Sequence, residues 1–175
     1  MSSRITQQWA TFSRLWYLID AYRQPPGRVA VAISKVLQGK HKPIYHPLSD
    51  VGDHVVVINA SQVAYSKDKW EEKIYYHHTG YPGGFSATPA QELHKKDPTK
   101  VIKKAVYGML PKDLRRREMM RRLHLYADDD VPEDIIANIS EQIKPSRELP
   151  KALTEYTQEE RDSFPRLWLP QEPKF

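Results

Sequence analysis

Two adjacent histidines, His77 and His78, stand in the stretch KIYYHHTGYPGG at residues 73–84, between a tyrosine pair and a glycine-rich turn. Such histidines could ligate a metal ion, act as a catalytic base or face a phosphate backbone. A shared metal ion is disfavoured because neighbouring side chains of a strand point to opposite faces. No HExxH pattern is present to complete a site, so we expect no metal.

Motifs of other kinds of active site are also missing. A nucleotide site would need GxxxxGK[ST] or GxGxxG after a strand, and QPPGR at 24–28 matches neither. There is no GxSxG elbow, and Asp128, Asp129 and Asp130 form a run of the solvated kind rather than spaced ligands. The chain has no cysteine, which excludes disulfides, thiolate zinc sites and cysteine nucleophiles. We predict a protein that is not an enzyme and that uses no cofactor and no small-molecule substrate.

Lysine, glycine and aromatic residues in residues 73–84 favour structured RNA as the partner. Lysines and backbone N–H groups contact phosphates, and glycine lets backbone approach a polyanion closely. Tyrosine and histidine offer stacking faces and partners for the 2′-hydroxyl group. GKHKP at 39–43 repeats these ingredients on a smaller scale. For each segment alone, a polar loop with turn-forming glycines remains the alternative.

A third segment, GMLPK at 108–112, leads into a cluster of five arginines. If residues 113–123 are helical, apolar side chains at Leu114, Met119, Met120 and Leu123 can face the protein. The remaining circumference is then crowded by Arg115, Arg116, Arg117, Arg121 and Arg122. Such a density of like charge is self-repulsive unless an anion compensates it, and RNA phosphates would do so. Pairing with the acidic run at 128–130 is the competing interpretation.

The net charge of +5 conceals two parts of opposite sign. Residues 127–175 hold 12 acidic and 6 basic residues, and residues 1–126 hold 21 basic and 10 acidic residues. A basic body with an acidic tail is typical of a polyanion-binding protein with an appendage. No apolar run approaches the roughly 20 residues of a membrane helix, so we expect no membrane partner.

Apolar periodicity predicts alternating strands and helices. Strands are expected at 15–19, 53–59 and 73–78, and helices at 28–37 (ended by Gly39), from Pro89 (capped by Thr88), from Thr99 as cap through Val106, and at 113–123, 132–143 and 156–164 (capped by Thr157). Alternation of this kind with strongly apolar strands indicates an α/β fold around a largely parallel sheet.

The chain divides into three expected parts, an amino-terminal arm at 1–14, an α/β domain at 15–127 and an acidic, proline-containing extension at 128–175. The arm has two arginines and no acid, which resembles a weak mitochondrial targeting segment. A short docking arm is the alternative. In the extension, apolar residues in a proline-bracketed segment are predicted to dock on a neighbouring protein, namely Phe164, Leu167, Trp168 and Leu169.

Six motifs in one order and spacing resemble the large-ribosomal-subunit protein 13 family in its bacterial and organellar form. They are WYLID at 16–20, GR at 27–28, LQGKHK at 37–42, GDHVVVINA at 52–60, KIYYHHTGYPGG at 73–84 and AVYGMLPK at 105–112. The resemblance covers about residues 15–127. It implies a three-layer α/β/α domain with a central, mostly parallel sheet. It also implies a place in the large ribosomal subunit, bound to its rRNA from early in assembly, without an enzymatic role.

Two departures from bacterial members resemble metazoan mitochondrial ones, the QPP turn at 24–26 and the long acidic region after about residue 130. In such members, extensions meet other proteins of the mitochondrial ribosome. We therefore expect a structural constituent of the large subunit of the mitochondrial ribosome, located in the matrix. Its expected partners are large-subunit rRNA and neighbouring ribosomal proteins. A regulatory RNA-binding module acting outside the ribosome is the alternative.

The residues predicted to contact RNA come from all these segments. They are Arg28, Lys40, His41, Lys42, Lys73, Tyr75, His77, His78, Thr79, Gly80, Tyr81, Gly83, Gly84, Lys103, Lys104, Gly108, Met109, Lys112, Arg115, Arg116, Arg117, Arg121 and Arg122.

Overall fold

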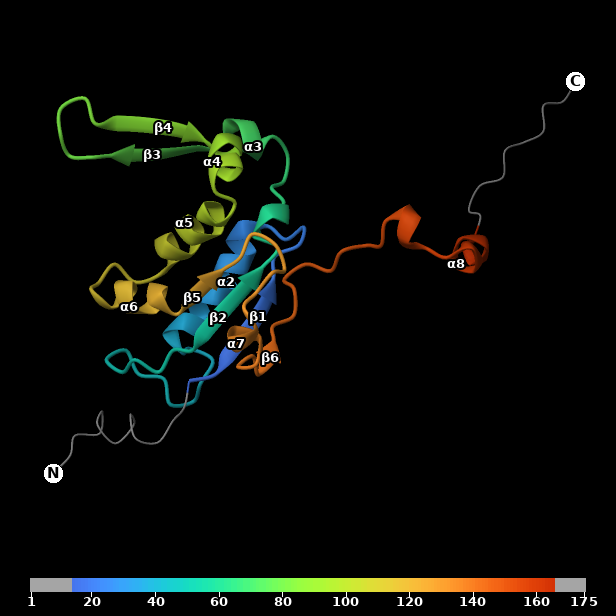
Figure 1. The fold of residues 1–175 in the computed structure, drawn as a ribbon, viewed down its shortest axis with the longest axis horizontal. Helices are drawn as coiled ribbons and strands as arrows, with labels where there is room; N and C mark the ends of the chain where they lie inside the picture. The colour runs from blue at the N-terminus through green and yellow to red at the C-terminus, as the bar shows by residue number, and fades with distance from the viewer. Residues whose placement is uncertain (1–13, 166–175) are drawn as a thin grey trace, which may run out of the picture.

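The computed structural model describes residues 14–165, and its centre is a four-stranded sheet (Figure 1). Strand β1 (Trp16–Asp20) pairs with β2 (His54–Ile58), which pairs in turn with β5 (Leu123–Leu125). At the opposite edge, β6 (Glu141–Gln142) pairs with β1, which gives the order β5-β2-β1-β6. All three pairings are parallel, so the predicted parallel sheet is confirmed.

Helix α2 (Pro26–Gln38) connects β1 to β2. Its first residue is proline. Proline has no backbone N–H, and this costs nothing at the first position because an N–H there would have no partner within the helix. It ends where Gly39 adopts a left-handed φ of 75° and donates its N–H to the Val36 carbonyl at 2.9 Å. A Cβ at Gly39 would stand 2.7 Å from the Val51 side chain. Both the left-handed φ and this close approach therefore require glycine at the position. The predicted helix end is confirmed.

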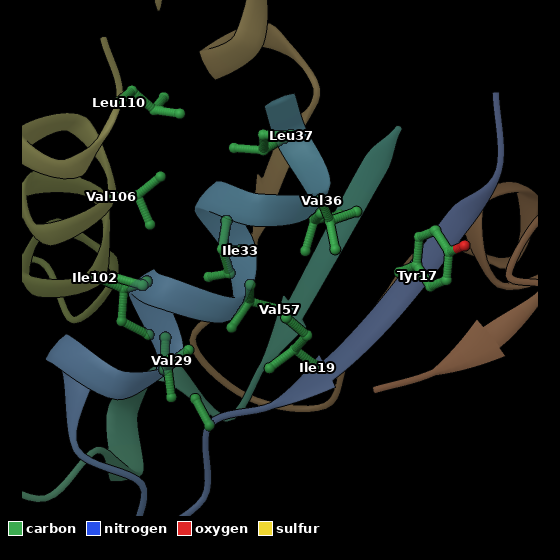
Figure 2. Packing of buried hydrophobic residues seen from close by; sticks show 14 of the residues in the cluster. Tyr17, Ile19, Val29, Ile33, Val36, Leu37, Val57, Ile102, Val106 and Leu110 are labelled. Atoms are coloured by element: carbon green, nitrogen blue, oxygen red, sulfur yellow. The ribbon is translucent and has the colours of Figure 1, made fainter. Parts of the chain in front are cut away.

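The core lies between the sheet, α2 and α5 (Thr99–Met109), as Figure 2 shows. Residues from all three elements are fully or almost fully buried, including Ile19, Val29, Ile33, Leu37, Val57, Ile102 and Val106. Burying one such side chain stabilises the fold by about 1.5–3 kcal/mol. The apolar side of α5 is thereby held against α2, and its polar side is turned to solvent.

The third predicted strand forms, but outside the central sheet. Strand β3 (Ile74–His78) pairs antiparallel with β4 (Phe85–Pro89), and this hairpin projects beyond the sheet (Figure 1). Short helices α3 (Lys69–Glu72) and α4 (Ala90–Lys96) lie at its base. Four of the five β3 residues are exposed, so this strand presents its side chains to solvent rather than to a core.

Two predicted helix caps are wrong, each for a local reason. Thr88 remains extended because it pairs with Tyr75 across the hairpin, and α4 begins only after Pro89. At α5, Thr99 is the first helical residue and not the cap. The Asp97 carboxylate takes that role, since it accepts hydrogen bonds from the Thr99 N–H at 3.0 Å and hydroxyl at 2.7 Å.

Helix α6 (Arg115–Arg121) is shorter than the helix predicted at 113–123. Met119 is buried as expected, but Leu114 is 85% exposed, so the apolar contact predicted for it is wrong. The Val55 N–H bonds to the Arg122 carbonyl at 3.0 Å, and pairing with β2 therefore draws the following residues into β5.

On the other face of the sheet lie the segment after residue 127 and the short helix α7 (Glu133–Ile136) (Figure 1). The longer helix predicted at 132–143 is wrong because the free edge of β1 captures the chain. Ser140 and Ile143 donate their N–H groups to β1 carbonyls at 2.9 and 2.8 Å. Helices therefore cover both faces of a parallel sheet, which confirms the three-layer α/β fold.

Beyond residue 147 the chain extends away from the domain as an arm (Figure 1). The arm contains the short helices η2 (Leu153–Glu155) and α8 (Gln158–Ser163). Thr157 caps α8: its hydroxyl accepts the Glu160 N–H at 3.3 Å, and the Glu160 carboxylate accepts the Thr157 N–H at 3.0 Å. The predicted helix and its cap are confirmed.

Candidate RNA-binding surface

The tip of the β3–β4 hairpin is a glycine turn with open backbone. Gly80 and Gly83 have φ values of 92° and 75°, and no atom lies within 4 Å of the position that a Cβ would take at either residue. A Cβ at Gly84 would stand 1.9 Å from the Thr79 hydroxyl oxygen. The turn is closed by a hydrogen bond from the Thr79 N–H to the Gly84 carbonyl at 3.1 Å. The glycines therefore shape the turn and leave its backbone accessible to a partner.

His77 and His78 occupy successive positions of β3, opposite Ser86 and Phe85, and both are exposed. They consequently face opposite sides of the hairpin. The His78 ring is tied to the turn, because its Nδ1 accepts the Gly80 N–H at 2.9 Å. Within residues 14–165, no group of three or more His, Asp or Glu side chains is placed to hold a metal ion.

The hairpin carries an exposed aromatic pair, Tyr76 and Phe85, that was not among the residues predicted to contact RNA. The rings of Tyr76 and Phe85 stack with centroids 5.8 Å apart, and they are 64% and 62% exposed. Tyr81 at the tip is 76% exposed. Apolar rings in water on a projecting hairpin offer faces on which unstacked bases can lie. Period-two alternation around Tyr76 was the signal that could have found the pair.

Helix α5 carries a row of lysines on its exposed side. Lys100, Lys103 and Lys104 line a groove of about 380 Å³ together with Tyr107 and Gly108. The structure thus brings together three predicted residues, Lys103, Lys104 and Gly108. Sequence reasoning missed Lys100 and Tyr107, although Lys100, Lys103 and Lys104 recur at helical spacing.

Tyr75 links this row to the base of the hairpin. The ammonium groups of Lys73 and Lys104 lie 5.3 and 5.6 Å from the centre of its ring. Its hydroxyl is 2.8 Å from that of Tyr65. Burial, followed by this hydrogen bond, raises the pKa of Tyr65, so the Tyr65 hydroxyl remains neutral.

The arginines of α6 that were predicted to meet phosphates are partly paired within the chain. Arg115 forms an ion pair with Asp113 at 2.6 Å, and Arg121 forms one with Glu118 at 3.0 Å. Both pairs are exposed, and exposed pairs contribute only about 0–1 kcal/mol. A phosphate can therefore replace either carboxylate at little cost.

Arg116 is fixed in a different way. Its guanidinium lies 4.3 Å above the Tyr107 ring and donates to the Pro111 carbonyl at 2.8 Å. With Lys112 and Arg117 it lines a second groove of about 380 Å³, which meets the α5 groove at Tyr107. The two grooves form one basic strip along α5 and α6.

Arg122 pairs within the fold, which argues against the RNA contact predicted for it. Its side chain is 8% exposed, and its guanidinium donates to both carboxylate oxygens of Asp50 at 2.7 Å. It also donates to the Leu37 carbonyl at 3.1 Å. A buried arginine needs such partners, because an unpaired charge inside the fold is strongly destabilising.

The GKHKP segment is largely structural as well. Asp53 is fully buried, with Lys42 Nζ at 2.5 Å and His41 Nε2 at 3.0 Å from its two oxygens. The Lys42 side chain is only 13% exposed and pairs with Asp53, which argues against the RNA contact predicted for it. His41 keeps part of its ring in solvent, and Lys40 is exposed.

The remaining predicted residues lie on or near the same side of the molecule. Arg28 and Met109 are exposed and line a cavity beside Lys73. The hairpin, α5 and α6 occupy one side, and the carboxy-terminal arm leaves from the other (Figure 1). On that arm Phe164 is 50% exposed and meets the Tyr156 ring edge-on at 5.1 Å. The other predicted docking residues lie outside the described part of the chain, namely Leu167, Trp168 and Leu169.

Among residues 14–165, no helix is long and apolar enough to span a membrane.

The sequence profile of the family described as Ribosomal protein L13 matches residues 14–132. The chain belongs to the ribosomal protein L13 family. The resemblance predicted from the six motifs is therefore confirmed.

Members of the L13 family from mitochondria and from bacteria are similar to this chain. It is 49% identical over 161 residues to the large ribosomal subunit protein uL13m of Drosophila melanogaster, covering 92% of this chain and 90% of that protein. It is 48% identical over 118 residues to uL13 of Acholeplasma laidlawii (67% and 83% covered). The identity to uL13 of Geobacter sulfurreducens is 46% over 122 residues (70% and 85% covered).

Proposed function

We propose that this protein is a structural constituent of the large subunit of the mitochondrial ribosome and that it binds and stabilises large-subunit rRNA. The observation that carries the proposal is the match to Drosophila uL13m, which spans 92% of this chain and so extends beyond the family profile at 14–132. Similarity along the extension, and not only in the shared domain, favours the mitochondrial ribosome over other uses of the fold. The protein accordingly acts in the mitochondrial matrix.

The rRNA-binding side consists of the hairpin, α5 and α6. Cations at Lys73, Lys103, Lys104 and Arg117 supply sequence-independent attraction to phosphates. The rings of Tyr76 and Phe85 and the open glycine turn add stacking and close backbone approach, which suit folded RNA with splayed bases. Binding to such a surface stabilises the RNA fold by neutralising phosphates that repel one another.

Sedimentation of the endogenous protein from lysed mitochondria tests this function. Co-migration with the large subunit and with the whole ribosome is expected. A protein that stays mainly at the top of the gradient would instead be the regulatory RNA-binding module outside the ribosome.

Within the carboxy-terminal arm, residues 151–175 are the part that we assign to neighbouring ribosomal proteins. Residues 127–175 carry a net charge of −6, which disfavours contact with phosphates, and Phe164 is half exposed. Deleting residues 151–175 should leave RNA affinity within about twofold of wild type and weaken attachment of an adjacent protein in purified subunits. Loss of RNA affinity on truncation would contradict this division of roles.

A further inference from the structure

A basic cavity of about 660 Å³ lies where the extension leaves the domain. Four cationic side chains line it, Arg28 from α2, Lys69 and Lys73 from the base of the hairpin, and Arg147 from the extension. Arg147 lies outside the region that the family profile matches. The cavity therefore joins residues of the shared domain to a residue of the extension.

Within the described chain, no carboxylate lines this cavity. A neighbouring cavity of about 400 Å³ shares Lys73 and Tyr65 with it and adds Lys104. Within residues 14–165, none of the lining lysines and arginines of the two cavities forms an ion pair, whereas Arg115, Arg121 and Arg122 do. Gathered cations without an internal counterion call for an anionic ligand.

Gln24 fixes the position of Arg147. Its side chain is 1% exposed and binds the backbone of Arg147 from both sides, with Nε2 donating to the carbonyl at 2.8 Å and Oε1 accepting the N–H at 3.0 Å. The Ser146 hydroxyl also donates to Oε1 at 3.3 Å. The Gln24 backbone is itself held, because its carbonyl accepts the Ala64 N–H at 3.1 Å. The buried amide thus ties the extension to the rim of the cavity.

The surroundings favour RNA over an acidic peptide. The second cavity continues through Lys104 and Gly108 into the lysine groove of α5, so the basic surface is unbroken from Arg147 to that groove. The α2 amino terminus also borders the first cavity, and its first turn contains no acidic residue. A polyanion that follows α5 would therefore continue into the cavity.

We propose that this cavity binds a phosphate of the RNA backbone and that Arg147, positioned by Gln24, is one of its ligands. The inference rests on the proposed function, since it extends the rRNA-binding side by a contact from the extension. Gln24 is a positioning residue: it touches no RNA and acts by holding Arg147 in place.

The test measures binding of the full-length protein to a large-subunit mitochondrial rRNA transcript at several salt concentrations. Arg147→Gln should weaken binding and flatten the slope of log affinity against log salt by roughly 0.7–0.9, the contribution of one phosphate. The control Arg161→Gln removes the same charge from α8 and should leave both quantities unchanged. If Arg147→Gln and Arg161→Gln bind the transcript equally well, the proposal is overturned. The proposed function would still stand in that case, because the wild-type protein binds the transcript.

Gln24→Leu separates positioning from charge. It changes no charge but releases Arg147, so it should reproduce the flatter slope, and the double variant should be no worse than Arg147→Gln alone. Circular dichroism confirms that each variant is folded. A Gln24→Leu variant that is folded and retains the wild-type slope would contradict the positioning role. A different outcome is that Arg147→Gln weakens the binding of poly-glutamate, added as a competitor, but not the binding of RNA. The cavity would then be a site for acidic protein, and the phosphate assignment would be wrong. Failure of the wild type to bind the transcript would contradict the proposed function itself.

Discussion

Asp50 and Arg122 stand 72 positions apart and form a two-pronged ion pair, with each carboxylate oxygen 2.7 Å from a guanidinium nitrogen. The pair joins the loop before β2 to the residue that follows α6. Partial burial alone would raise the pKa of Asp50, but hydrogen bonds and charge from Arg122 and then Arg14 outweigh it and lower that pKa. The carboxylate therefore stays ionised beside a buried cation, and this arrangement holds the basic helix against the sheet.

Adjacent arginines at 121 and 122 should behave in opposite ways when they are changed. Arg122→Gln leaves the Asp50 charge without its buried partner and should lower the free energy of unfolding by about 3 kcal/mol. Arg121→Gln removes only an exposed pair and should change it by at most about 0.5 kcal/mol. Urea unfolding monitored by tryptophan fluorescence measures both. Equal stability of the two variants would place Arg122 at the surface and contradict the structure.

A histidine pair on the sheet should make stability depend on pH. His54 and His124 lie 3.4 Å apart between ring nitrogens, and Trp16 stacks on His54 with centroids 4.1 Å apart. Burial lowers the pKa of both histidines below 6.5, and the positive charges of His124, Arg122 and Arg14 lower that of His54 further, against the opposing charge of Asp53. As pH falls through 6.5, the unfolded chain therefore binds protons before the folded chain does, and stability decreases toward the folded pKa.

The measurement is urea unfolding at pH 7.5 and pH 5.5. Wild type should be less stable at the lower pH. The double variant His54→Phe/His124→Phe should lose most of that difference because neither ring can then take up a proton. A double variant with the full wild-type pH dependence would show that other groups are responsible.

The exposed rings of the hairpin should contribute to RNA affinity but not to stability. Tyr76→Ala and Phe85→Ala should each weaken binding to the rRNA transcript by about 1–3 kcal/mol if a base stacks on the ring. Because both rings are more than half exposed, thermal unfolding should hardly change. Phe164→Ala, at the residue that follows α8, is the matched control and should leave affinity unaltered. Affinities that stay at the wild-type level would remove the hairpin rings from the RNA contact.

The arginines of α6 should act through charge alone. The triple change Arg115→Gln, Arg116→Gln and Arg117→Gln should flatten the salt slope by roughly 2–3 units and weaken cognate and unrelated RNA alike. Stability should fall by about 1–2 kcal/mol at most, since Arg115 loses an exposed ion pair and Arg116 loses part-buried hydrogen bonds to the Pro111 and Leu110 carbonyls. The control carries three charge-removing changes in the extension, at Lys144, Lys151 and Arg161. A large drop in stability with an unchanged slope would mean that the arginines serve the fold.

Much of the architecture could be predicted from local pattern. The apolar runs predicted β1 and β2, the periodicity and Gly39 predicted α2, and Thr157 as a cap predicted α8. The strands β5 and β6 could not be predicted, since three- and two-residue strands carry almost no periodicity. They form because β1 and β2 offer unpaired edges in the folded chain.

The candidate site was predictable by residue type and less so by residue. A count of arginines cannot distinguish Arg121 at the surface from Arg122 beside Asp50, because the difference depends on a residue 72 positions away. Lys42 was similarly predicted to contact RNA, although its ammonium group forms an ion pair with Asp53. The summed charge of the extension also concealed Arg147, which the fold places among Arg28, Lys69 and Lys73.

Ultraviolet crosslinking of intact mitochondrial ribosomes tests most directly whether this side of the protein contacts large-subunit rRNA. Crosslinked peptides from this chain should come from 73–89, 100–109 and 112–121, with Tyr76, Tyr81 and Phe85 among the crosslinked positions. Residues 151–165 should give no crosslinks to rRNA. Crosslinks confined to the arm, or a hairpin that stays uncrosslinked in ribosomes containing the protein, would contradict the account.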